Sequence, residues 1–172
     1  MRKPKPHLTP VEEDAVILVV EDSDDDLLLF KRALLATRLS FEVRSVETCS
    51  EARDYLLGTG RFVDRAAFPF PKLIMADNCR APFSTAEFLR WLRGHPECRV
   101  IPIVMLSGSR DPKLVEIAYQ LGIHSFFEKP TNHLALQSLL KMILEYWAAA
   151  LVPDPQECEP SSRAFCAEPD MG

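Results

Sequence analysis

Several side chains suited to binding phosphate and divalent cations stand just after short apolar runs of the chain. They are the acidic pair Glu21 and Asp22 after residues 15–20, Asp77 after 72–76, Ser107 after 101–106, and Lys129 after the run that begins at 125. Carboxylates that lie close together repel each other, so a group of three favours a cationic partner. Magnesium suits such a group, because it takes oxygen ligands, uses few protein carboxylates and keeps several waters. The residue types therefore predict a Mg²⁺ site that handles phosphate.

Each of these residues has a separate predicted role in phosphoryl transfer. We expect Asp22 and Asp77 to bind Mg²⁺ directly and Glu21 to act through a water molecule. With the metal and Lys129 beside it, Asp77 stays ionised and serves as the nucleophile. The metal and the Lys129 ammonium offset the charge of the phosphoryl oxygens during a loose, in-line transfer, while Ser107 donates a hydrogen bond to one of those oxygens. Taken alone, each residue has an ordinary explanation as a helix cap, a turn residue or an exposed lysine, so the prediction depends on their joint occurrence.

Alternating strand and helix patterns are predicted to position these side chains. The apolar run 15–20 is typical of a strand that is buried on both faces, as in a parallel sheet. Further strands are expected at 41–46, 72–76, 101–106 and 125–127, and helices from Ser23, from Thr48 to Gly58, from Ser84 to about Gly94, from Asp111 to Gly122 and from about Thr131. Two of the helix starts show the spacing of a capping box, Thr48 with Glu51 and Ser84 with Glu87. Five strands alternating with five helices predict an α/β fold whose parallel sheet is covered on both faces, with the chemistry at the carboxyl ends of the strands.

The length of 172 residues favours one domain. We expect a flexible N-terminal lead-in over 1–14, a domain over 15–150 and a disordered tail over 151–172, because the tail contains proline, serine and acidic residues without periodicity. A docking peptide is the alternative interpretation of that tail.

Composition excludes some classes of partner. The net charge is −5 and no Lys/Arg cluster suits a phosphate backbone, so nucleic-acid binding is not expected. The N-terminus lacks the apolar part of a signal peptide, and no apolar run approaches the ~18 residues that span a bilayer, so no membrane association and a cytoplasmic location are expected. The five cysteines form no Cys-x-x-Cys pair, which indicates free thiols in a reducing compartment.

Four motifs together resemble the receiver domain of two-component response regulators. They are Val19-Val20-Glu21-Asp22-Ser23, Leu73-Ile74-Met75-Ala76-Asp77, Val104-Met105-Leu106-Ser107-Gly108 and Lys129-Pro130. The resemblance extends from Val16 to Trp147. The acidic opening at 21–26 and the long loop before the third strand are similar to single-domain receivers related to phytochrome-partner regulators.

The resemblance implies a fold and a signalling role. The fold would be flavodoxin-like, with a doubly wound sheet in the strand order 2-1-3-4-5. A histidine kinase or a phosphotransfer protein would phosphorylate Asp77, so that the protein itself is a signalling receiver and not an enzyme acting on a separate substrate. The main-chain carbonyl of Cys79 would be the third protein ligand to Mg²⁺, and the peptide bond between Lys129 and Pro130 would be cis.

The resemblance also implies a conformational switch. Phosphorylation would draw Ser107 toward the phosphoryl group and let the Phe126 ring turn inward. The face made by the fourth helix, fifth strand and fifth helix would then change, which is a two-state shift biased by a local charge event. Output would pass to a downstream protein partner or through a homodimer.

Two positions depart from the pattern of the family. Ala81 stands where the family has proline, with Pro82 one residue later, and Ser84-Thr85 replaces the usual Asp-Gly before the third helix. These changes leave open the conformation of the loop, recognition by the kinase and the lifetime of the phosphoryl group.

Two other functions remain open at this point. One is a receiver-like binding module that does not switch. The other is a phosphatase of the haloacid-dehalogenase type, with Asp22 as nucleophile and Asp24 as general acid. The phosphatase interpretation leaves Asp77 unexplained. It also needs a later strand that carries an acidic pair, and no such strand is predicted after Lys129.

Overall fold

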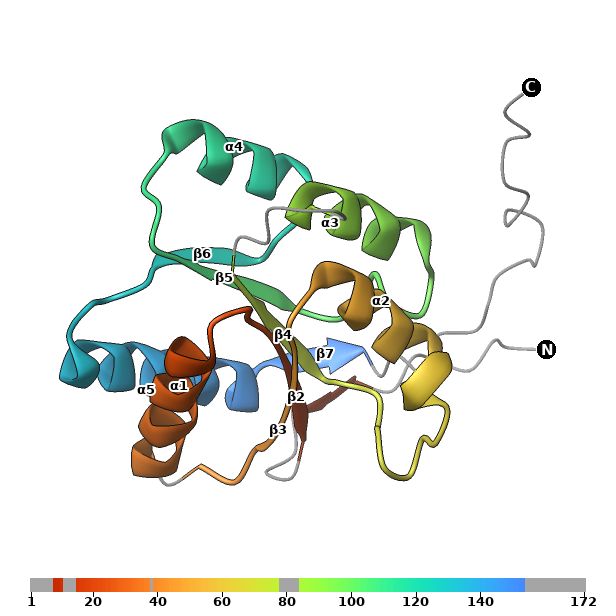
Figure 1. The fold of residues 1–172 in the computed structure, drawn as a ribbon, viewed down its shortest axis with the longest axis horizontal. Helices are drawn as coiled ribbons and strands as arrows, with labels where there is room; N and C mark the ends of the chain where they lie inside the picture. Colours follow the sequence, from red (N-terminus) through yellow and green to blue (C-terminus); the bar gives the residue numbers. More distant parts are fainter. Residues whose placement is uncertain (1–7, 11–14, 38, 78–83, 154–172) are drawn as a thin grey trace.

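A five-stranded parallel sheet runs through the middle of the molecule (Figure 1). The computed structural model describes residues 8–10, 15–37, 39–77 and 84–153. The strands of this sheet are β2 (Val16–Val20), β3 (Glu42–Val46), β4 (Leu73–Ala76), β5 (Ile103–Ser107) and β6 (Ser125–Glu128). Their spatial order is β3-β2-β4-β5-β6, which is the order 2-1-3-4-5 when these five are counted along the chain. The predicted topology is confirmed.

Helices cover both faces of the sheet (Figure 1). One face carries α1 (Asp24–Thr37) and α5 (His133–Ala149), and the other carries α2 (Cys49–Leu57), α3 (Thr85–Gly94) and α4 (Pro112–Gln120). Two apolar clusters result, one on each side of the sheet. Because the three central strands β2, β4 and β5 are covered on both sides, they form continuous apolar runs up to Ser107 at the end of β5, whereas the outer strands β3 and β6 contain polar residues.

The strand β2 shows how one apolar run serves both clusters. Leu18 and Val20 pack with α2 and α3, whereas Ile17 and Val19 pack with α1 and α5. All residues of β2 are buried, which explains the uninterrupted apolar run from Ala15 to Val20.

Local capping interactions define most helix starts. The side chain of Ser84 accepts from the N–H of Glu87, and the Glu87 carboxylate accepts from the N–H of Ser84, so the capping box predicted for α3 is formed. The box predicted for α2 is only half formed. Thr48 accepts from the N–H of Glu51, but the Glu51 carboxylate accepts from Glu47. Helix α2 then ends at Gly58, which has a φ of 66° that favours glycine.

The segment between α2 and β4 begins with a short 3₁₀-helix, η1 (Gly60–Phe62), and packs on α2 through aromatic rings. Its Arg65 guanidinium donates to the carbonyl oxygens of Tyr55 at 2.7 Å and Leu56 at 2.6 Å, in the last turn of the helix. The long predicted loop is thus held against the end of α2.

A small antiparallel ribbon joins two short segments near the two ends of the described chain. Strand β1 (Leu8–Pro10) pairs with β7 (Leu151–Pro153). The ribbon pairs two segments far apart in sequence, and Val152 is buried in the apolar cluster beside α1 and α5. The flexibility expected for 1–14 and 151–172 stays a prediction. The rest of 1–14 and of 151–172 lies outside the described residues.

Within the described ranges, no helix combines the length and the apolar character needed to cross a bilayer.

Candidate functional site

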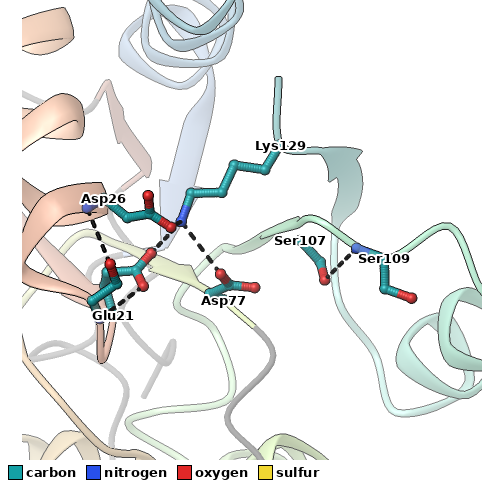
Figure 2. Close-up of polar contacts among 7 residues, drawn as sticks. Glu21, Asp26, Asp77, Ser107, Ser109 and Lys129 are labelled. Atoms are coloured by element: carbon teal, nitrogen blue, oxygen red, sulfur yellow. Dashed lines mark hydrogen bonds and ion pairs between the residues drawn. The ribbon is translucent and has the colours of Figure 1, made fainter. Parts of the chain in front are cut away.

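The Lys129 ammonium lies among three carboxylates at the carboxyl ends of the strands (Figure 2). Its Nζ donates to Glu21, to Asp26 Oδ2 at 2.8 Å and to Asp77 Oδ2 at 3.3 Å. Three residues predicted from strand ends, Glu21, Asp77 and Lys129, thus meet at one point although more than 100 residues separate the first from the last.

Backbone hydrogen bonds just beyond the strands hold these residues in place. The N–H of Glu21 donates to the carbonyl of Val46 at 3.0 Å, and the N–H of Asp77 donates to the carbonyl of Val20 at 3.0 Å. The N–H of Lys129 donates to the carbonyl of Ser107 at 2.8 Å. The strand pairing therefore continues by one residue into the site, so the register of the sheet sets where each side chain starts.

The first turn of α1 contributes Asp26, a site residue that the sequence prediction missed. The Ser23 hydroxyl accepts from the N–H of Asp26 at 3.3 Å, and Glu21 accepts from the N–H of Ser23 at 3.1 Å. The sequence contained a signal for this position, since Asp26 precedes the buried Phe30 by four residues and so shares its face of the helix.

The predicted metal ligand Asp22 is not part of this group. Its side chain is exposed, whereas the three carboxylates that gather around Lys129 are those of Glu21, Asp26 and Asp77. A role of Asp22 in binding metal stays a prediction. The carbonyl of Cys79 and the atypical positions Ala81 and Pro82 lie outside the described residues.

At both Glu21 and Lys129, burial and neighbouring charges shift the pKa in opposite directions. Burial raises the pKa of Glu21 above the ordinary value of a glutamate, although hydrogen bonding from Lys129 opposes this shift. For Lys129, burial lowers the pKa, but the hydrogen bonds to Asp26 and Glu21 and the negative charges of Glu21 and Asp77 together outweigh burial and raise the pKa above that of a free lysine. The ammonium therefore stays charged throughout the physiological range.

The three carboxylates fit a small hard cation. Glu21, Asp26 and Asp77 each offer an oxygen, and these atoms all lie within 4.8 Å of one another. Oxygens on opposite sides of a Mg²⁺ ion stand about 4.2 Å apart. The Lys129 ammonium contacts all three carboxylates, so a bound ion would compete with it for these oxygens. The donor set, made only of carboxylate oxygens, is the kind that hard divalent cations prefer.

The two predicted switch residues occupy neighbouring strands. Ser107 is buried at the end of β5, and its hydroxyl accepts from the N–H of Ser109 at 3.2 Å (Figure 2). Phe126, in β6, is partly buried against the apolar cluster that contains α3 and α4. Its N–H donates to the Tyr119 hydroxyl of α4 at 3.2 Å. The cis geometry expected between Lys129 and Pro130 stays a prediction.

Comparison with known proteins places this geometry in a family. No protein-family model matches the chain. The response regulator Rcp1 of Synechocystis is 26% identical over 132 residues, which cover 77% of this chain and 88% of Rcp1. The bacteriophytochrome response regulator AtBRR is 31% identical, with a TM-score of 0.63 and coverage of 77% of this chain and 92% of AtBRR.

The chain belongs to the response regulator receiver family. Other solved receivers have higher TM-scores to this chain than AtBRR has. The phosphorylated cyanobacterial phytochrome response regulator RcpA has a TM-score of 0.74 at 28% identity, covering 81% of this chain and 99% of RcpA. The Mn²⁺-bound form of Rcp1 has a TM-score of 0.71 at 26% identity, covering 81% of this chain and 99% of that one. RcpA and AtBRR are phytochrome response regulators, as predicted for the relatives of this receiver.

Proposed function

We propose that this receiver accepts a phosphoryl group on Asp77 and thereby switches a partner-binding face. The observation that carries the proposal is the Lys129 ammonium, 3.3 Å from Asp77 and within a group of three carboxylates. A cation beside a carboxylate at a strand end provides both the nucleophile and the charge that a phosphoryl group needs.

In the proposed reaction, one Asp77 carboxylate oxygen attacks the phosphorus of a phosphorylated histidine on a kinase or phosphotransfer protein. The new O–P bond forms as the N–P bond to the histidine breaks, and the histidine nitrogen leaves with the electron pair. Lys129 offsets the charge on one phosphoryl oxygen, and Ser107 donates its hydroxyl hydrogen to another.

A divalent cation is the proposed cofactor of this step. Asp77 directly and Glu21 through a water are the described residues proposed to hold Mg²⁺, together with Asp22 and the Cys79 carbonyl, while Asp26 is hydrogen-bonded to Lys129. Bound there, the metal would neutralise phosphoryl charge as a Lewis acid. The Mn²⁺-bound form of Rcp1 supports a divalent site in this family.

The proposed output is a change at the face made by α4, β6 and α5. Ser107 would turn from Ser109 toward the phosphoryl group, and the space it leaves would let Phe126 move further inward. Because Phe126 is joined to α4 through Tyr119, the helix would respond to the movement of the strand. A protein partner or a second copy of the chain would bind the altered face, in the cytoplasm.

Labelling with acetyl phosphate tests the proposal. With Mg²⁺, wild type should gain the mass of one phosphoryl group, and chelation of the metal or Asp77→Asn should abolish the gain. Asp64→Asn, which removes an aspartate from the exposed segment after η1, should be labelled as wild type is. A wild type that stays unlabelled would favour a non-switching binding module. Labelling that persists in Asp77→Asn would contradict the assignment of the acceptor.

A further inference from the structure

The Lys129 ammonium has a carboxylate partner for each of its three N–H donors. Those partners are Glu21, Asp26 and Asp77, and only 15% of the lysine side chain is exposed. In the unphosphorylated receiver, the hydrogen-bonding capacity of the ammonium is therefore fully used.

Asp26 is the partner whose separation from Lys129 costs the least free energy. Its side chain is 40% exposed, whereas that of Glu21 is 7% exposed. Water can replace the ammonium at an exposed carboxylate, but a buried one would lose its counter-charge without compensation. Asp26 also lies on α1, outside the sheet, so its release leaves the strand pairing intact.

Phosphorylation would require such a release, since a phosphoryl group on Asp77 brings oxygens that need a donor from Lys129. We propose that Asp26 is a positioning residue that holds Lys129 in the unphosphorylated state and gives it up when the phosphoryl group arrives. The inference rests on the proposed function of Asp77. By stabilising the unphosphorylated state, Asp26 lowers the affinity of the site for a phosphoryl group and sets how readily the receiver is activated.

Beryllium fluoride, which mimics a phosphoryl group on a carboxylate, provides a direct test. Its binding is measured by calorimetry, with each variant at its own saturating Mg²⁺ concentration so that changes in metal affinity do not enter. Asp26→Asn keeps the shape of the side chain and removes its charge, and should bind about three- to tenfold more tightly than wild type, as expected for one partly exposed charged hydrogen bond. Asp25→Asn removes the same charge from an exposed neighbour in the same helical turn, and should stay within about twofold of wild type.

A double-mutant cycle separates the action through Lys129 from simple repulsion between Asp26 and the anion. In a Lys129→Gln background, Asp26→Asn should change the affinity by less than about twofold, because no ammonium remains to be held. If binding in that background is too weak to titrate, the rate of labelling by excess acetyl phosphate is compared instead.

Two results would overturn the inference. One is an Asp26→Asn affinity no higher than that of Asp25→Asn, and the other is an equal gain with and without Lys129. A different result would contradict the proposed function itself: the wild-type chain would neither bind beryllium fluoride nor become labelled.

Discussion

At the scale of single residues, the site depends on one cation that balances three carboxylates. Lys129 directly follows β6, while the carboxylates come from the end of β2, the start of α1 and the end of β4. One ammonium therefore joins three separate elements. Its loss would affect folding as well as phosphoryl transfer, because the remaining negative charges repel each other.

Lys129→Gln should lower the free energy of unfolding by about 1–3 kcal/mol without divalent metal, the cost of leaving partly buried carboxylates unpaired. Adding Mg²⁺ should recover more stability in this variant than in wild type, since the metal replaces the missing charge. Urea unfolding with Mg²⁺ and with a chelator measures both effects. Equal stabilisation by Mg²⁺ in the two proteins would contradict the competition between ammonium and metal.

A second residue-scale prediction concerns His124, whose Nδ1 accepts from the N–H of Ile103 at 3.1 Å. Partial desolvation of this otherwise exposed residue, together with the nearby Arg93 charge, lowers the pKa of His124 below its ordinary value of 6.5. The unfolded chain therefore takes up the proton more readily, so stability from the neutral ring is complete above about pH 6.5 and is lost as the pH falls.

His124→Asn keeps an acceptor for Ile103 and removes the titrating group. Between about pH 7 and pH 5, this variant should lose less unfolding free energy than wild type. Chemical unfolding at several pH values measures the difference. Parallel pH profiles for the two proteins would show that His124 does not contribute.

At the scale of elements, α4 and β6 are linked through the hydroxyl of Tyr119. Strand β6 is at the edge of the sheet, and this hydroxyl accepts from the N–H of Phe126. The bond joins the strand of the predicted switch residue to a helix of the proposed output face.

Tyr119→Phe should lower the stability by less than about 1 kcal/mol, because Tyr119 is partly exposed and water can replace its hydroxyl. The amide of Phe126 should exchange its hydrogen faster, as measured by NMR. Tyr146→Phe removes the hydroxyl of another exposed tyrosine, on α5, and should leave that amide unchanged. Unchanged exchange in Tyr119→Phe would show that the bond is not populated in solution.

At the scale of the whole molecule, strand β7 lies just beyond residue 150, the predicted end of the domain. The ribbon of β1 and β7 brings the two ends of the described chain together beside α5. Val152 is 7% exposed and belongs to the cluster under α1 and α5, whereas its neighbour Leu151 is 61% exposed. The two residues therefore form a matched pair for testing whether β7 packs on the domain.

Val152→Ala should lower the free energy of unfolding by about 1–2 kcal/mol, as expected when buried methyl groups are removed. Leu151→Ala should cost less than about 0.5 kcal/mol, because its side chain faces solvent. Thermal or urea unfolding provides the comparison. Similar, small effects in both variants would support the predicted domain limit at 150.

The sequence by itself determined the sheet and most of the residues at its edge. Buried parallel strands need continuous apolar runs, and such strands end at one edge, so Glu21, Asp77, Ser107 and Lys129 could be placed without coordinates. These are local sequence patterns. They predict the strands correctly because each apolar run is long enough to define its own strand.

Only the tertiary structure decided which second acidic residue of 21–26 joins Glu21 beside Lys129, and that 8–10 pairs with 151–153. The choice of Asp26 over Asp22 depends on how α1 is rotated against the sheet, which its packing through Phe30 sets. The ribbon depends on pairing between residues more than 140 positions apart. Both are contacts between distant segments, whose free energy comes from packing that no local pattern records.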